Sequence, residues 1–286
     1  MSEALVLCRF LHFSVVLMLF GVWLFRPLLL KVEARVLDLR TARLARWLAT
    51  VALLSAVAWA LLITASMAGS TAAAFDPDTL ALVFGKTFFG QVWRWHLLLN
   101  AALLALLFTP WRSSTPLRLG LSALLVVTLA PVGHGAMLEG LSGQLLILNQ
   151  ALHLICVAAW LGGLLLLLVM LLRAPSEPMG QILRRFSGVG YALVAGLLIT
   201  GLINVRVLTG QWWPTPLFSG FALILLIKAL LVLGMLGLAL FNRSRSEDCE
   251  QRIGALRRSV MIEWLLGIGA VAAVSLLGTL PPMIKG

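Results

Sequence analysis

The sequence predicts an all-α membrane protein, a polytopic bundle of eight transmembrane helices with both termini outside the cytoplasm. The prediction rests on composition, on the spacing of apolar segments and on the placement of basic residues. Of the 286 residues, 61% are hydrophobic and 12% are charged, and the mean hydropathy is +1.02. Ordinary soluble domains contain about 25% charged residues. The composition therefore excludes a soluble globular protein.

Apolar segments long enough to cross the hydrocarbon core, which takes roughly 20 residues, occur eight times in the chain. They lie at about 5–25, 46–69, 92–109, 117–137, 145–172, 186–208, 217–241 and 259–280. No long linker and no clear internal repeat separates them. We therefore expect a single transmembrane domain over residues 1–286.

The first of the eight spans could be mistaken for a signal peptide. Residues 5–25 lack a basic n-region and a small-residue cleavage site, and a basic loop follows them directly, so we interpret them as a retained span. The second span follows that loop. The third opens with "WRWH", at Trp93 to His96, and the fourth ends in "GHGAMLEG", at Gly133 to Gly140.

The last four spans carry polar residues at defined depths. The fifth has Asn149, Gln150, His153 and Cys156 in its first half, ahead of a wholly apolar second half. The sixth has Asn204 and Arg206 near its outer end. The seventh has Lys228 near its middle, and the eighth has Glu263 about one turn from its cytoplasmic end. Charges at such depths face a cavity or a partner, and we expect Lys228 and Glu263 to pair.

Basic residues follow the alternation of the connections between spans. Sixteen of the 22 Lys and Arg residues lie in the odd-numbered connections: Arg26, Lys31, Arg35, Arg40, Arg43, Arg46, Arg112, Arg118, Arg173, Arg184, Arg185, Arg243, Arg245, Arg252, Arg257 and Arg258. The positive-inside rule assigns these connections to the cytoplasm. The formal net charge of +11 therefore reflects topology and does not indicate a nucleic-acid partner.

This topology places all four histidines in the outer half of the membrane or at its outer edge: His12, His96, His134 and His153. Potential soft ligands lie at helical spacing beside three of them. Cys8 is four residues before His12, Cys156 is three after His153, and Met137 is three after His134, so each pair shares a helix face.

Imidazole, thiolate and thioether are the ligands that Cu(I) prefers, and Zn would accept the first two. The alternative for each histidine is a hydrogen bond to a neighbouring helix. We interpret His96, between aromatic and basic neighbours, as an interfacial anchor outside the metal site. Glu139 lies in a short loop between glycines, where it could ligate a metal or be solvated.

Several motifs resemble the CopD family of bacterial copper-resistance inner-membrane proteins. The match runs over nearly the whole chain and includes "RFLHF", "GHGAMLEG", "ALHLICVAAWLGGL", "RFS", "LLIKALLV", "FNR", "EWLLG" and "GTLPP". His153, Trp160 and Gly163 belong to its most specific element. The resemblance implies a multi-pass protein of the bacterial inner membrane that handles copper together with a periplasmic copper-binding protein of the CopC type. The positive-inside rule then places both termini in the periplasm.

We therefore expect a protein that accepts copper at a periplasmic-side site and moves it toward the cytoplasm in copper homeostasis and resistance. The leading ligands are His12, His134 and His153, and the supporting ligands are Met137, Glu139, Cys8 and Cys156. We expect Trp160, Gly162 and Gly163 to pack helices around this site. No nucleotide-binding motif is present, and we expect no enzymatic activity. The alternative is a membrane redox protein that binds haem b through two of His12, His134 and His153.

Overall fold

The computed structural model describes residues 2–30, 35–133, 138–172, 179–218, 220–244 and 253–278, and these residues form helices and no strand. The α-helices are α1 (Ser2–Leu29), α2 (Arg35–Ala68), α3 (Pro77–Lys86), α4 (Phe88–Leu106), α5 (Thr115–Leu129), α6 (Gly140–Leu171), α7 (Met179–Thr209), α8 (Gly220–Ser244) and α9 (Ile253–Leu277). Two 3-10 turns, Ala72–Phe75 and Pro110–Ser113, lie in the connections. The predicted all-α class is confirmed.

Six of these helices, α1, α2, α6, α7, α8 and α9, are long and apolar enough to cross a membrane. The helices α4 and α5 lie where the sequence predicts the other two spans, but α4 has 19 residues with polar groups on it and α5 has only 15. The short helix α3 is additional to the predicted spans. Asp76 caps it, because its carboxylate accepts a hydrogen bond from the Thr79 backbone N–H.

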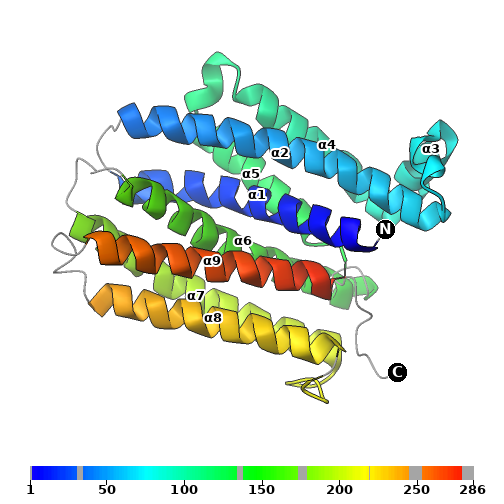
Figure 1. Ribbon diagram of the computed structural model, residues 1–286. Coiled ribbons are helices and arrows are strands. Elements are labelled where there is room, and N and C mark those ends of the chain that lie inside the picture. Colours follow the sequence, from blue (N-terminus) through cyan, green and yellow to red (C-terminus); the bar gives the residue numbers. More distant parts are fainter. Residues whose placement is uncertain are drawn as a thin grey trace.

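The helices run roughly alongside one another, with α1 near the middle of the molecule (Figure 1). The helix α1 contacts α2 and α5 on one side and α6 and α9 on the other, and α8 packs against α9. Gly21 and Gly162 allow α1 and α6 to touch backbone to backbone, since a Cβ added to Gly162 would lie 2.6 Å from the Gly21 Cα. The predicted packing role of Gly162 is confirmed.

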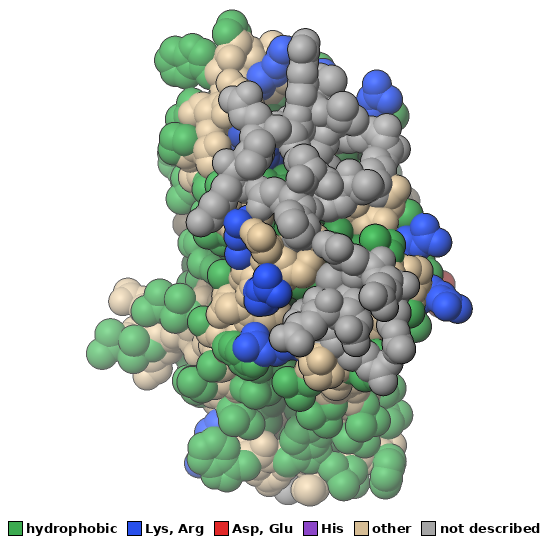
Figure 2. Space-filling model, turned by 90° about the vertical axis from the view of Figure 1, so that its left-hand side faces the viewer, with side chains coloured by type: hydrophobic (Ala, Val, Ile, Leu, Met, Phe, Trp, Pro, Cys, Tyr) green, Lys and Arg blue, Asp and Glu red, His purple; other side chains and the backbone are tan. Residues whose placement is uncertain are grey.

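The start of α1 and the end of α9 lie at the same end of the molecule (Figure 1). Figure 2 shows the opposite end, where Lys and Arg side chains gather around the helix ends. Arg26 in the last turn of α1 and Arg243 in the last turn of α8 belong to this end. Basic side chains therefore gather at one end of the molecule, as the basic odd-numbered connections in the sequence predict.

Candidate functional site

Two buried histidines face each other between α1 and α4. The Nε2 atoms of His12 and His96 are 2.7 Å apart, and both side chains are 0% exposed. The structure therefore contradicts the interpretation of His96 as an interfacial anchor. The anchor at this point of α4 is its neighbour Trp95, which is 65% exposed, because successive residues of a helix point in different directions.

The Nδ1 atom of each histidine in this pair contacts a hydroxyl group from another helix. The Nδ1 of His12 lies 2.9 Å from the Ser55 Oγ on α2, and the Nδ1 of His96 lies 2.7 Å from the Thr128 Oγ1 on α5. Each hydroxyl also contacts a backbone carbonyl of its own helix, Ser55 that of Val51 and Thr128 that of Leu125. Each hydroxyl thus lies between a histidine and a backbone carbonyl of its own helix.

The two histidines form a hydrogen bond with each other. Their Nε2 atoms are 2.7 Å apart, so one ring donates its Nε2–H to the Nε2 lone pair of the other. A neutral imidazole has one donor and one acceptor nitrogen, so the donating ring accepts at Nδ1 from its hydroxyl and the other ring donates from Nδ1 to its hydroxyl. Both Nε2 atoms are thereby directed at one point between the rings.

Aromatic rings enclose the pair. Trp93 stacks on His96 with ring centroids 4.5 Å apart, and the Trp59 ring lies edge-on to His12 at 5.7 Å. Both indoles are almost completely buried, and Trp93 donates its Nε1–H to the Ala56 carbonyl. The electron-rich faces of such rings favour a cation that has left water.

Cys8 lies one turn before His12 and faces the same helix. Its thiol donates to the Ser55 carbonyl at 3.3 Å, while His12 contacts the Ser55 hydroxyl. The expected shared face of Cys8 and His12 is therefore confirmed, and it points toward α2. Within the described part of the chain, however, no three His, Cys, Asp or Glu side chains lie close enough together to hold a metal.

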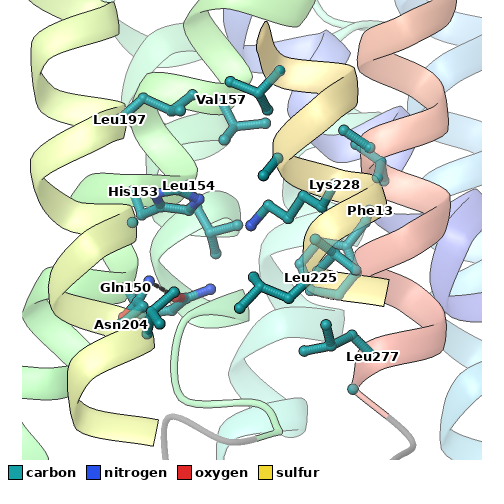
Figure 3. Close-up of a pocket in the computed structure, with 18 of the residues that line it drawn as sticks. Phe13, Gln150, His153, Leu154, Val157, Leu197, Asn204, Leu225, Lys228 and Leu277 are labelled. Carbon is teal, nitrogen blue, oxygen red and sulfur yellow. Dashed lines mark hydrogen bonds between the residues drawn. The ribbon is translucent and has the colours of Figure 1, made fainter. Parts of the chain in front are cut away.

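His153 lies in a different environment. It lines a cavity between α6, α7, α8 and α9, and its Nδ1 is 2.9 Å from the Thr200 Oγ1 on α7. Cys156 faces α7 as well, since its Sγ would lie 2.9 Å from a Cβ at Gly196. Lys228 extends from α8 toward His153 (Figure 3). A lysine ammonium beside His153 opposes the binding of a metal cation there.

The remaining predicted ligands lie around the connection between α5 and α6. His134 and Met137 fall outside the described residues, so their predicted role stays a prediction. Glu139 directly precedes α6 and is exposed, and its side chain makes no capping hydrogen bond.

The haem alternative does not fit the pair of facing histidines. Bis-imidazole ligation of haem needs flat apolar space for the porphyrin around the axis between the two rings. Trp59 and Trp93 fill the space beside the rings of His12 and His96.

The expected pairing of Lys228 with Glu263 is wrong. Glu263 on α9 accepts hydrogen bonds from the Trp160 Nε1 at 3.0 Å and from the Asn242 Nδ2 at 3.4 Å. Asn242 and Lys228 both lie on α8, and their separation of 14 residues corresponds to about 21 Å along the axis. Lys228 therefore lies well away from Glu263 along the helix axis, and the two charges do not meet.

Comparison with known proteins identifies the family. Residues 1–144 match the family model "Copper resistance protein D-like, N-terminal domain", and residues 180–277 match "Copper resistance protein D". The chain belongs to the copper resistance protein D family. His12 and His96 both lie within the first match of this CopD-family chain, and Lys228 and Glu263 lie within the second.

Three relatives span much of the chain. It is 33% identical over 287 residues to the inner membrane protein YebZ of Escherichia coli, covering 96% of this chain and 97% of that protein. It is 28% identical to the copper resistance protein D of Pseudomonas syringae pv. tomato, covering 97% and 96%. It is 25% identical to the copper transport protein CutJ of Bacillus subtilis, covering 76% of this chain and 41% of that one.

No solved structure matches the chain. The family, the YebZ relative and the six candidate spans make the chain a multi-pass protein of the inner membrane.

Proposed function

We propose that this CopD-family chain accepts copper from the periplasm and moves it toward the cytoplasm, and that it holds the ion as Cu(I) between His12 and His96. The observation that carries the proposal is the pair of Nε2 atoms that face each other at 2.7 Å while hydroxyl groups occupy both Nδ1 atoms. Copper takes the place of the Nε2 proton between the two rings, and the ring that loses this proton is then protonated at Nδ1, where it donates to its hydroxyl partner.

The geometry of the pair suits a two-coordinate ion. Bonds of about 2 Å to each nitrogen need a separation of about 4 Å, so the two rings must move apart by about 1.3 Å from 2.7 Å. Cu(I) accepts linear coordination by two donors, whereas structural Zn²⁺ takes four. A single positive charge is also less costly to bury than a double one, and neither ring supplies a negative charge to offset it.

The proposed direction of transport is inward, and it is supported by the placement of charge. We place the start of α1 and the end of α9 in the periplasm, because the basic connections lie at the other end of the molecule. Cys8 then lies on the periplasmic side of His12 and acts as a ligand on the way in. Inward movement of a cation gains about 2.3 kcal/mol per charge per 100 mV of membrane potential. We propose a CopC-type periplasmic protein as the copper donor, and a transport role without enzymatic activity.

An anaerobic Cu(I) titration of the full-length protein against a chromogenic chelator tests the site. Wild-type protein should bind one high-affinity Cu(I), and His12→Ala and His96→Ala should each abolish it. His153→Ala is the matched control, since His153 is also a buried histidine bonded to a threonine, and it should retain the ion. Retention by His96→Ala, or loss only in His153→Ala, would contradict the proposal.

Transport needs its own measurement. Proteoliposomes loaded with a Cu(I) indicator should accumulate copper faster when the interior is negative. The two variants of the histidine pair should lose this accumulation, and an equal rate in liposomes without protein would contradict a transport role.

A further inference from the structure

A cavity that His12 and His96 do not line has no assigned occupant. It has a volume of about 370 Å³ and lies among α6, α7, α8 and α9, and residues of α1 and from the end of α5 also line it. This volume is in the range of small-molecule sites. Most of its walls are aliphatic, with Leu154, Val157, Leu197 and Leu225 among the residues around it (Figure 3).

The cavity reaches the surface of the molecule between α7 and α8, which scarcely touch each other. Three leucines that line it are also exposed: Leu198 and Leu202 of α7 are 43% and 52% exposed, and Leu233 of α8 is 60% exposed. Both helices are candidate membrane spans. The opening therefore faces lipid, and an apolar molecule can enter it from the bilayer.

Hydrogen-bond donors without partners face this apolar space. The Lys228 ammonium points into the cavity (Figure 3), and it makes no hydrogen bond or ion pair with the residues that the structure describes. Gln150 uses its Oε1 to accept from Asn204, which leaves its own N–H groups available. The indole nitrogen of Trp213, another lining residue, is buried without a partner.

The cavity has a positive charge and no acid to balance it. None of the described residues that line it is Asp or Glu, whereas Lys228 and Arg9 are both present. Arg9 is held elsewhere, because its guanidinium donates to the Gly278 carbonyl. An ammonium in apolar surroundings at this depth is costly unless an anion accompanies it. An anion with oxygen acceptors would offset this charge and accept hydrogen bonds from the donors.

We propose that this cavity is a binding site for a single-chain anionic amphiphile, a long-chain carboxylate, whose head group pairs with Lys228 and whose hydrocarbon chain leaves between α7 and α8. The carboxylate accepts from Lys228 and Gln150, and the aliphatic walls cover the first part of the chain. A copper ion is disfavoured here by the same positive charge that attracts the carboxylate. The site is independent of the proposed copper function, because His12 and His96 do not line this cavity.

Native mass spectrometry of the full-length protein in detergent, titrated with palmitate, tests the proposal. We expect one saturable palmitate per chain and at least about tenfold weaker binding of hexadecanol, which has the same chain length without the charge, because a charged hydrogen-bonded pair is lost. Lys228→Met should weaken palmitate binding by a similar factor. Lys86→Met, at an exposed lysine of α3, is the matched control and should bind as the wild type does.

A second variant tests the route without changing the charge. Leu202→Trp narrows the opening between α7 and α8 and should also weaken palmitate binding. The helical content of each variant, measured by circular dichroism, reports on folding without reference to copper. Equal binding of hexadecanol and palmitate, or unchanged palmitate binding in Lys228→Met, would overturn the proposal. Tighter binding of decylubiquinone than of palmitate would overturn it in favour of a quinone site.

Discussion

Replacing Gly162 by alanine should force α1 and α6 apart. The added Cβ would lie 2.6 Å from the Gly21 Cα and 2.7 Å from the Val22 N, both of which are backbone atoms that no side-chain rotation can move. Carbon atoms in contact are normally about 3.5–4.0 Å apart, so the helices must separate by about 1 Å. Such overpacking costs about 1–3 kcal/mol, of which the higher helix propensity of alanine recovers about 0.5–1 kcal/mol.

Gly188→Ala on α7 is the control, because a Cβ at Gly188 would meet nothing within 4 Å. Gly188→Ala should gain the same helix propensity without the clash, so the two variants should differ by the overpacking cost of about 1–3 kcal/mol. Unfolding in mixed micelles of increasing dodecyl sulfate content measures the free energy of unfolding of each. Equal stability of the two variants would refute the backbone contact between α1 and α6.

Three further predictions concern the buried polar groups and the topology. Trp160→Phe removes a hydrogen bond to the buried Glu263 carboxylate and should cost about 1–3 kcal/mol of unfolding free energy. The same change at the exposed Trp95 should cost nothing measurable. Equal losses of stability in the two variants would exclude the hydrogen bond. Lys228→Met and Glu263→Gln should have additive effects on the free energy of unfolding in the double variant, because the residues do not pair. A double variant that is more stable than the sum of the two single effects predicts would restore the ion pair. Alkaline phosphatase fused to the C-terminus should be active, because the C-terminus lies in the periplasm. An inactive phosphatase fusion, together with fluorescence from a cytoplasm-specific reporter fused at the same position, would invert the topology.

Helix positions were predictable because the constraint on them is local. A helix in lipid must satisfy its own backbone hydrogen bonds, so length and hydropathy alone locate it. The charge asymmetry was predictable for the same reason, since Arg26 and Arg243 follow their own spans directly. Helical spacing also placed Cys8 and His12 on one face, as observed.

Which faces meet across helices was not predictable, because it depends on packing between distant segments. His12 and His96 are 84 residues apart and bond through Nε2, yet the neighbours of His96 in sequence suggested the interface. One signal pointed to the pairing: His96 is followed by Asn100 one turn later, so polar groups line one face of this helix. The depth of Lys228 and of Glu263 in their spans likewise did not reveal their separation.

X-ray absorption at the copper edge of Cu(I)-loaded full-length protein tests the central claim most directly. The claim predicts two nitrogen neighbours at about 2 Å, with no sulfur in the first shell, because the facing Nε2 atoms of His12 and His96 are the ligands. His96→Ala should remove the bound copper and with it the signal. A sulfur neighbour, a shell of four donors, or an unchanged spectrum in His96→Ala would contradict it.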